Sequence, residues 1–387
     1  MKICYVNPTN NIRRPIAELA EILVKEGHNI GVLFPVSKEC PTKNWVANDR
    51  VKQSAVQRIP VASWYFSPLR YSFPNPIQLF KGVRKVVKNY DKIHVWEYYY
   101  PLSVMTLLYA FFTCQRDKII LTTDGFVGYS YKPKRPRWLV PAFKLYTQLF
   151  ARLLFKIPPI ITTYGKSMLP YAEKAGVPMS KLKVIPTGIH LERFQNVSNE
   201  RVEQLREEFS IKDEKVILFV GMLTERKGVD KVIDVSIKLL EEGMNIKTLI
   251  VGDAHGKNIY QKMVPERYKD KIIFAGGRRD IPELMKLADV LLLPSEGEGL
   301  PGVVMEAMAA GLPVVATREG CTPDLIEDGV GGYLVRMDEN FEGYQEMILK
   351  LFQSKLSKDN AVKIVRSNIF SFRWPDVTKK YNNLYQK

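Results

Sequence analysis

Short runs of β-branched residues alternate with amphipathic segments along this 387-residue chain. The first half opens with strand candidates at Ile3–Val6 and Asn29–Phe34, on either side of a helix at Pro15–Glu26 that Gly27 ends. A strand, a crossover helix and a second strand in that order form a parallel pair covered by the helix. The alternation starts afresh in the second half, so the sequence predicts two α/β units.

Further strand and helix candidates continue this pattern in both halves. Strands are predicted at Lys92–Trp96, Lys118–Thr122, Pro159–Thr163, Lys215–Val220, Ile246–Val251, Lys271–Phe274, Val290–Pro294 and Pro313–Ala316. Helices are predicted at Gly228–Glu242, Ile281–Leu287 and Gly302–Ala310. We therefore expect two Rossmann-like, doubly wound domains that work in a central cleft beyond the carboxyl ends of their strands.

The domain boundary is predicted near Val184–Phe194, where Ile185–Ile189 has the pattern of a strand ending in a turn. Residues 1–186 then form the first domain and residues 187–371 the second. Residues 372–387 have a helical pattern and are a candidate to pack back onto the first domain; the apolar positions are Trp374, Val377, Tyr381, Leu384 and Tyr385.

The excess of positive charge is confined to the first half of the chain. Residues 1–190 hold 28 Lys and Arg against 10 Asp and Glu, whereas residues 191–387 hold 29 against 31. This asymmetry favours an anionic partner for the first half, either a membrane surface or nucleic acid. Aromatic and basic clusters without a recognised nucleic-acid fold favour the membrane.

Two clusters combine basic and aromatic residues. One is a helix predicted at Leu139–Lys156, with Lys144, Gln148, Arg152 and Lys156 on one face and Phe143, Tyr146, Phe150, Leu153 and Leu154 on the other, preceded by Lys132, Lys134, Arg135, Arg137 and Trp138. The other runs from Trp64, Tyr65 and Phe66 to Pro74, Phe80, Lys81, Arg84, Lys85 and Lys88. Peripheral docking to anionic lipid is one interpretation, and a surface helix packed on the sheet is the other.

We expect a cytoplasmic protein that binds the cytoplasmic face of a membrane without crossing it. The four cysteines are dispersed and form no Cys-x-x-Cys pair, which suits a reducing compartment and argues against structural zinc. The apolar run Ile3–Val6 is too short for a signal-peptide core, and Trp138–Phe155 holds too many polar residues for a bilayer span.

A glycine-rich loop carries the strongest functional pattern. A strand ends at Pro294, the loop Ser295–Pro301 follows, and a short helix at Gly302–Ala310 is closed by Gly311. Uncapped amides at a helix N-terminus favour phosphate. Glu298 and Glu306 suit the hydroxyls of a sugar and a ribose, although both could instead stabilise the helix dipole.

In this context the chain resembles the family-four glycosyltransferases of the GT-B fold, which have a Glu-x7-Glu motif that Glu298 and Glu306 match. The resemblance implies that Glu298 contacts the donor sugar and that Glu306 holds the nucleotide ribose. It also implies that the amides around Gly299, Leu300 and Gly302 bind the donor diphosphate.

A second match to the family lies at Val220–Gly228, the loop after the first strand of the donor domain. The resemblance implies that Gly221 lies at the nucleotide and that Lys227 neutralises the departing diphosphate without a metal. The arginine usual in the family is replaced by Met222, which cannot donate a hydrogen bond. Arg226 either takes its place or is a solvated loop charge.

The first half fits the family less closely. The loop Asn7–Asn11 lacks the usual glycines, and Asp124 follows a Thr-rich strand where many members have a histidine. Asp124 is a candidate base for the acceptor, or it caps the turn at Gly125. His94 is the other candidate, although a histidine among apolar neighbours is commonly a core residue.

The resemblance implies a retaining hexosyltransferase that needs no cofactor or metal. Its donor is expected to be a nucleotide sugar, either a UDP-sugar or a GDP-sugar. The basic clusters suggest a membrane-borne acceptor, either a polyprenyl-phosphate-linked sugar or a glycolipid, and no nucleic acid. Two alternatives are a non-catalytic sugar-nucleotide-binding subunit and a GT-B nucleotide-sugar epimerase.

Overall fold

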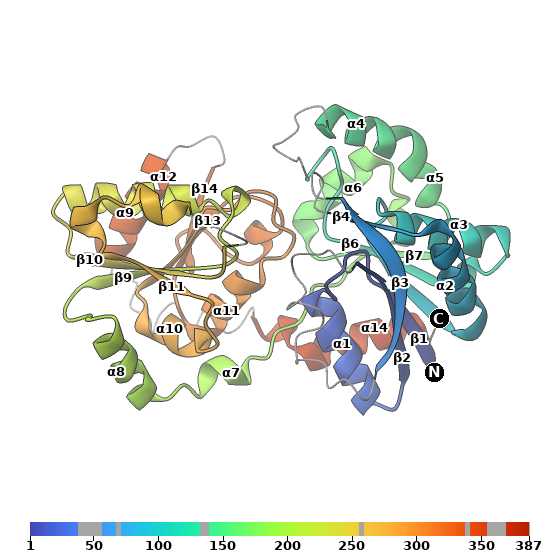
Figure 1. Cartoon of the computed structure of the whole chain (residues 1–387), viewed down its shortest axis with the longest axis horizontal. Helices are drawn as coiled ribbons and strands as arrows, with labels where there is room; N and C mark the ends of the chain where they lie inside the picture. Colours follow the sequence, from blue (N-terminus) through green and yellow to red (C-terminus); the bar gives the residue numbers. More distant parts are fainter. Residues whose placement is uncertain are drawn as a thin grey trace. The chain divides into compact units, whose positions relative to one another are not determined.

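The structure is a computed structural model, and it describes residues 1–37, 56–66, 71–131, 139–254, 259–336, 341–353 and 369–386. The chain divides into two compact units (Figure 1). Unit 1 comprises Met1–Gly188 and Trp374–Lys387, and unit 2 comprises Ile189–Arg373. The divisions thus fall two residues later than the sequence pattern suggests.

Unit 1 is built on an eight-stranded sheet with the order β4-β3-β2-β1-β5-β6-β7-β8, parallel except for the β3–β4 pair. Its strands are β1 Lys2–Val6, β2 Asn29–Val36, β3 Val56–Phe66, β4 Tyr71–Pro74, β5 Lys92–Trp96, β6 Ile119–Thr123, β7 Ile160–Thr163 and β8 Leu182–Val184. Its helices are α1 Arg14–Lys25, α2 Pro76–Asn89, α3 Pro101–Phe112, α4 Leu139–Tyr146, α5 Arg152–Leu154, α6 Leu169–Ala175 and α14 Trp374–Tyr385.

The C-terminal helix α14 belongs to the core of unit 1. Trp374, Val377 and Tyr381 are buried with residues of α1, β1 and β2 in one cluster. Figure 1 shows α14 beside α1, and the indole Nε1 of Trp374 donates to Glu18 of α1 over 2.9 Å. A Cβ on Gly188 would lie 2.2 Å from the Trp374 ring, so only glycine fits there.

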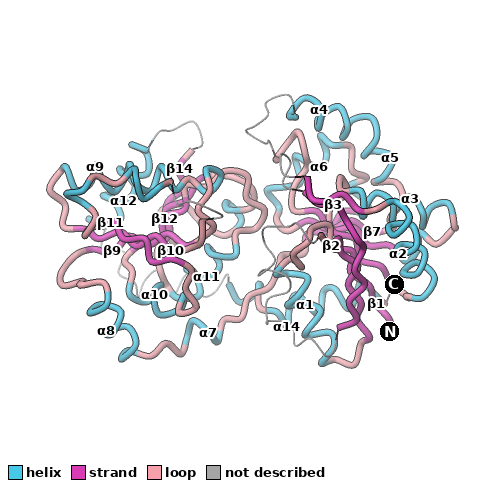
Figure 2. The backbone as a smooth tube through the Cα atoms, viewed as in Figure 1, coloured by secondary structure: helices cyan, strands magenta, loops and turns pink. Residues whose placement is uncertain are grey.

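Unit 2 is built on a six-stranded parallel sheet with the order β11-β10-β9-β12-β13-β14. Its strands are β9 Lys215–Val220, β10 Ile246–Val251, β11 Ile272–Gly276, β12 Val290–Leu293, β13 Val314–Thr317 and β14 Gly332–Val335. Its helices are α7 Glu192–Gln195, α8 Asn199–Glu208, α9 Val229–Glu241, α10 Ile281–Leu287, α11 Gly302–Ala310 and α12 Phe341–Gln353. Helices α9 and α12 cover one face and α10 and α11 the other (Figure 2).

Two expectations from the sequence need correction. The strand before the boundary ends at Val184, so Ile185–Ile189 is loop.

The helix predicted at Leu139–Lys156 is interrupted by a π-helical turn at Thr147–Ala151. Its apolar side chains are not all covered by the sheet, because Phe150 and Leu153 are exposed while Leu154 is buried. The basic residues Lys132, Lys134, Arg135 and Arg137 and the neighbouring Trp138 lie outside the described residues.

Among the described residues, no helix has the length and apolar character needed to cross a bilayer. In the same part of the chain, no cluster of three or more His, Cys, Asp and Glu side chains has an arrangement suited to a metal ion.

Candidate active site

In unit 2, the two loops that carry the predicted donor-site residues follow neighbouring strands. Strands β9 and β12 are paired in parallel, so the loop after Val220 and the loop after Leu293 leave the same edge of the sheet. The backbone N–H of Glu296 donates to the carbonyl of Arg226 over 2.8 Å, and Lys231 Nζ pairs with Glu296 at 3.3 Å. These bonds hold the two loops against each other.

Lys227 and Glu298, which lie 71 positions apart in the sequence, are in direct contact. Lys227 Nζ donates to Glu298 Oε1 over 2.5 Å, and Arg226 Nη1 lies 3.6 Å from the same oxygen. Burial opposes ionisation of Glu298, but the two cations outweigh it and hold the pKa of this carboxyl below its ordinary value. Glu298 is therefore an ionised carboxylate at neutral pH.

Arg226 lies against the glycine-rich loop as well as beside Glu298. Its Nη1 donates to the carbonyl of Gly297 over 3.1 Å, and its side chain remains partly exposed. Met222, which lies in the loop after β9 together with Arg226, is also partly exposed. The structure thus places the Arg226 guanidinium beside Glu298. Its role at a donor diphosphate, in place of the arginine that Met222 replaces, stays a prediction.

Helix α11 begins directly after this loop. Pro301 is its N-cap residue and supplies no side-chain hydrogen bond to the first turn, which starts at Gly302. The loop is shaped by close backbone contacts, because the Gly299 carbonyl accepts from the Cys321 amide over 2.8 Å. A Cβ on Gly320, whose φ is +60°, would meet the Glu298 carbonyl at 1.8 Å.

The other predicted donor-side residues lie in or beside the same loops. Leu300 is nearly buried in the loop, and Glu306 is buried on the fifth residue of α11. Gly221 follows β9, where a Cβ on Gly252 would lie 1.7 Å from the Gly221 carbonyl oxygen. The ends of β9 and β10 therefore approach each other more closely than side chains would allow.

In unit 1, Asp124 is part of a charged cluster that sequence reasoning missed. Arg13 donates from Nη1 to Glu97 over 2.6 Å and from Nη2 to Asp124 over 2.5 Å. The three residues follow β1, β5 and β6, which are neighbours in the sheet. A signal was present, because Glu97 comes directly after a predicted strand in a half of the chain that has few acids.

The first loop of unit 1 is organised without glycine. Asn7, which is buried, accepts from the Arg13 amide over 3.1 Å and donates to the carbonyls of Thr9 and Asn11. The Asn7 side chain thereby fixes the turn that delivers Arg13 to Glu97 and Asp124.

His94 is a core residue of unit 1. Its Nδ1 lies 2.7 Å from the Tyr385 hydroxyl and its Nε2 lies 2.6 Å from the Thr122 hydroxyl. Burial lowers the pKa of His94 well below its ordinary value, so the ring is neutral. Because both ring nitrogens are used inside the core, His94 is not available to an acceptor.

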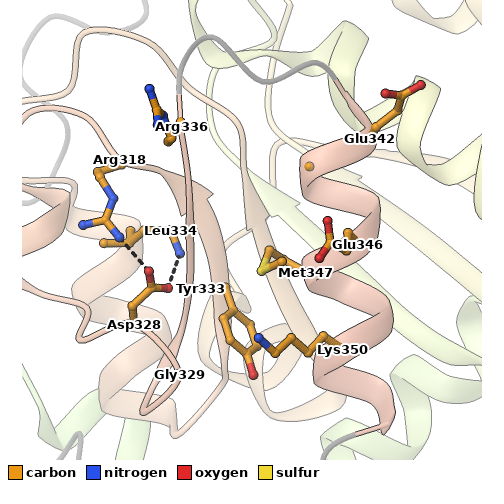
Figure 3. Close-up of a pocket in the computed structure, with 11 residues that line it drawn as sticks. Arg318, Asp328, Gly329, Tyr333, Leu334, Arg336, Glu342, Glu346, Met347 and Lys350 are labelled. Atoms are coloured by element: carbon orange, nitrogen blue, oxygen red, sulfur yellow. Dashed lines mark hydrogen bonds and ion pairs between the residues drawn. The ribbon is translucent and has the colours of Figure 1, made fainter.

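Unit 2 also has a hollow of about 960 Å³ between β14 and α12 (Figure 3). Arg318 Nη2 pairs with Asp328 at 2.6 Å, and Lys350 Nζ lies 5.0 Å from the centre of the Tyr333 ring. Three bases and three acids line the hollow, so it has no excess of either charge. Its lining includes neither Lys227 nor Glu298.

Solved structures share this fold over nearly the whole chain. Anabaena Alr3699/HepE, crystallised with UDP and glucose, has 19% identity and a TM-score of 0.74, covering 99% of this chain and 98% of its own. WaaG, a glycosyltransferase of lipopolysaccharide biosynthesis, has 20% identity and a TM-score of 0.70, covering 98% of each chain. The two α/β units, each built on a largely parallel sheet, are those of the GT-B fold.

Two sequence families match successive parts of the chain. Residues 13–193 match the family described as Glycosyltransferase Family 4, and residues 201–367 match Glycosyl transferases group 1. The chain belongs to the family-four glycosyltransferases.

Among curated relatives, spore coat protein SA of Bacillus subtilis (strain 168) is 30% identical over 54% of this chain and 59% of its own. N-acetyl-α-D-glucosaminyl L-malate synthase of Bacillus anthracis is 29% identical over 47% and 48%. The match thus spans only about half to three fifths of these relatives.

Proposed function

We propose that this chain transfers a hexose from a nucleoside-diphosphate sugar, with retention at the anomeric carbon, to an acceptor held by unit 1. The contact between Lys227 and Glu298 carries this proposal. It brings a cation suited to a diphosphate and a carboxylate suited to sugar hydroxyls to one strand edge, beside the first turn of α11.

The proposed chemistry needs no nucleophile from the enzyme. The bond from the anomeric carbon to the diphosphate oxygen breaks as the acceptor oxygen bonds to the same face of that carbon, and the acceptor proton passes to the departing diphosphate. Lys227, Arg226 and the amides of Gly299, Leu300 and Gly302 stabilise the negative charge. Glu298 orients the sugar, Glu306 holds the ribose and Gly221 lies at the nucleotide.

For the donor, we propose a UDP- or GDP-sugar. HepE, which has the same fold, was crystallised with UDP and glucose and also with UDP-glucose, so UDP-sugars are the first donors to try. Its identity to this chain is below 20%, so the choice rests on experiment.

For the acceptor, we propose a lipid in the cytoplasmic face of a membrane. On α4 and the turns that follow it, Leu145, Leu149 and Leu153 are 56, 66 and 57% exposed, at successive steps of four residues. Lys144, Arg152 and Lys156 are exposed beside them. We call these six residues the helical patch. A row of outward-facing leucines beside a row of basic side chains fits an anionic lipid surface. Each basic residue near such a surface contributes about 1 kcal/mol to the free energy of binding.

A second exposed group lies on β3 and α2. Trp64, Phe66 and Phe80 project into solvent, and Lys81 and Arg84 are exposed on the same helix as Phe80. Exposed aromatic rings among basic side chains are typical of surfaces that insert into lipid headgroups. Two such groups within the unit that carries the excess positive charge support peripheral docking of unit 1 to a membrane.

Transfer of labelled sugar to a membrane lipid extract tests the proposal. The wild-type chain, Glu298→Ala and the control Glu203→Ala, an exposed glutamate on α8, are each incubated with labelled UDP- and GDP-sugars. We expect lipid-soluble label from one donor, dependent on the extract and lost only in Glu298→Ala. Equal donor consumption without extract would indicate the epimerase instead, and nucleotide binding without consumption would indicate a binding subunit, which Met222 favours.

A further inference from the structure

Glu97 has an unusual backbone and an unusual burial. Its φ is +60°, a left-handed conformation that costs a residue with a Cβ about 1 kcal/mol or more. Its side chain is fully buried, yet it is a carboxyl group beside a second carboxyl group. A fold retains strain and a buried acid at one position when the geometry they produce is needed.

The hydrogen bonds of Thr123 indicate the protonation state of Glu97. Thr123 Oγ1 lies 2.7 Å from Glu97 Oε2 and 2.6 Å from the carbonyl oxygen of Gly125. A hydroxyl has one hydrogen, and the carbonyl can only accept, so both contacts are satisfied when Thr123 donates to Gly125 and Glu97 is protonated and donates to Thr123. Burial first, and then Asp124, raise the pKa of Glu97 to about 8, against the influence of Arg13.

This arrangement leaves Arg13 and Asp124 as a neutral pair that a ligand can reach. The side chains of Arg13 and Asp124 are 30 and 26% exposed, whereas that of Glu97 is 0% exposed. A hydroxyl can donate to Asp124 and accept from Arg13 at once. A phosphate or carboxylate would be repelled by the Asp124 carboxylate, and Arg13 would attract it only weakly because Arg13 is already paired with Asp124.

We infer that Arg13 and Asp124 form a subsite for a neutral, hydroxyl-bearing group of the acceptor, such as a sugar ring, and that Glu97 is its positioning residue. Glu97 holds Arg13 directly, accepts from the Asp124 backbone N–H over 3.3 Å, and reaches Gly125 through Thr123. The inference rests on the proposed function, because it names the acceptor group of that reaction.

Ionisation of Glu97 has a defined consequence. The charged groups and phenols that interact with Glu97 are Arg13, Asp124, Tyr98, Tyr99 and Tyr100. Above about pH 8 the ionised Glu97 takes the Thr123 hydrogen and the Gly125 carbonyl loses its bond, so the turn that carries Asp124 keeps only the backbone N–H bonds of Asp124 to Glu97 and of Gly125 to Thr123. Binding of the hydroxylated group therefore weakens in alkali.

Saturation-transfer NMR on the full chain tests the inference with soluble probes. The probes are the methyl α-D-glycosides of glucose, galactose and mannose, with glycerol phosphate as the anionic comparison. Glu97→Ala and Glu97→Gln are compared with Glu173→Gln, a control at an exposed glutamate of α6. Nucleoside-diphosphate binding is measured on the same samples.

We expect wild type and Glu173→Gln to bind a glycoside, and Glu97→Ala to bind it about tenfold less tightly. Glu97→Gln should bind like wild type at about pH 6 but keep its affinity at about pH 9, because it cannot ionise. Glycoside binding that is absent in wild type, unchanged in Glu97→Ala or weaker than that of glycerol phosphate overturns the inference. Should Glu97→Ala not fold, an unaltered pH dependence in Glu97→Gln does the same. If one of these overturning results is found while nucleotide binding is intact, the inference fails and the proposed function stands. If wild type binds no nucleotide, the proposed function itself fails.

Discussion

Lys227 Nζ lies 2.5 Å from Glu298 Oε1, so a cation and a carboxylate from loops 71 positions apart neutralise each other at one strand edge. In the proposed reaction they have different partners, since Lys227 binds the diphosphate and Glu298 the sugar. Donor binding would therefore exchange one ion pair for two interactions with the substrate.

Glu298→Gln should separate these two roles. Without the carboxylate, Lys227 is free for phosphate, so we expect a nucleoside diphosphate without sugar to bind a few times more tightly. Sugar transfer should nevertheless fall by about a hundredfold or more, because the amide cannot replace the charge. Calorimetry and a transfer assay measure the two effects, with Glu203→Gln as the control. Parallel losses in nucleotide binding and transfer would contradict this division of roles.

Glu97→Gln should stabilise unit 1 in a pH-dependent manner. The folded protein keeps the Glu97 proton up to about pH 8, whereas the unfolded chain releases it near its ordinary value. The unfolded state thus binds fewer protons between these values, and wild-type stability falls as the pH rises through them. The variant escapes this loss, so its advantage in the free energy of unfolding should grow from pH 5 to about pH 8. Denaturant titrations across this range measure it, and a constant difference would refute the burial of a protonated acid.

The helical patch should be needed for membrane binding but not for folding. Leu145→Glu, Leu149→Glu and Leu153→Glu combined should abolish flotation with anionic liposomes while the melting temperature stays near that of wild type, because all three side chains are exposed. Ile259→Glu is a matched control, since Ile259 is an equally exposed apolar residue in unit 2. Retained flotation of the triple variant, or loss of flotation in the control, would remove the patch from the account.

Tyr385→Phe should weaken the attachment of α14. The Tyr385 hydroxyl contacts His94 at 2.7 Å and Tyr5 at 3.1 Å inside the core. Its removal leaves a buried imidazole nitrogen without a partner, which costs about 1–3 kcal/mol. Thermal and denaturant unfolding should show this loss, and proteolysis should release the C-terminal segment sooner. Wild-type stability would mean that the buried network does not hold the helix.

The sequence predicted the neighbourhood of Lys227 and Glu298 better than that of Arg13 and Asp124 for a physical reason. Lys227 and Glu298 each follow a predicted strand in a loop with a recognisable pattern, and parallel strands bring such loops to one edge. Arg13 carries no local pattern, the only signal at Glu97 is its place directly after a predicted strand, and their contact joins positions 84 apart. Periodicity also placed Leu153 and Leu154 on one helix face, but it could not tell that only Leu154 is covered.

The most direct test is calorimetric titration of the wild-type chain, Lys227→Met and the control Lys238→Met with UDP, GDP and their sugars. Lys238 lies on α9, away from the strand edge that carries Lys227. We predict that one nucleotide binds wild type and Lys238→Met equally and binds Lys227→Met about tenfold or more weakly, through loss of a charge-assisted bond to phosphate. Equal affinity in all three proteins would contradict a donor diphosphate at Lys227.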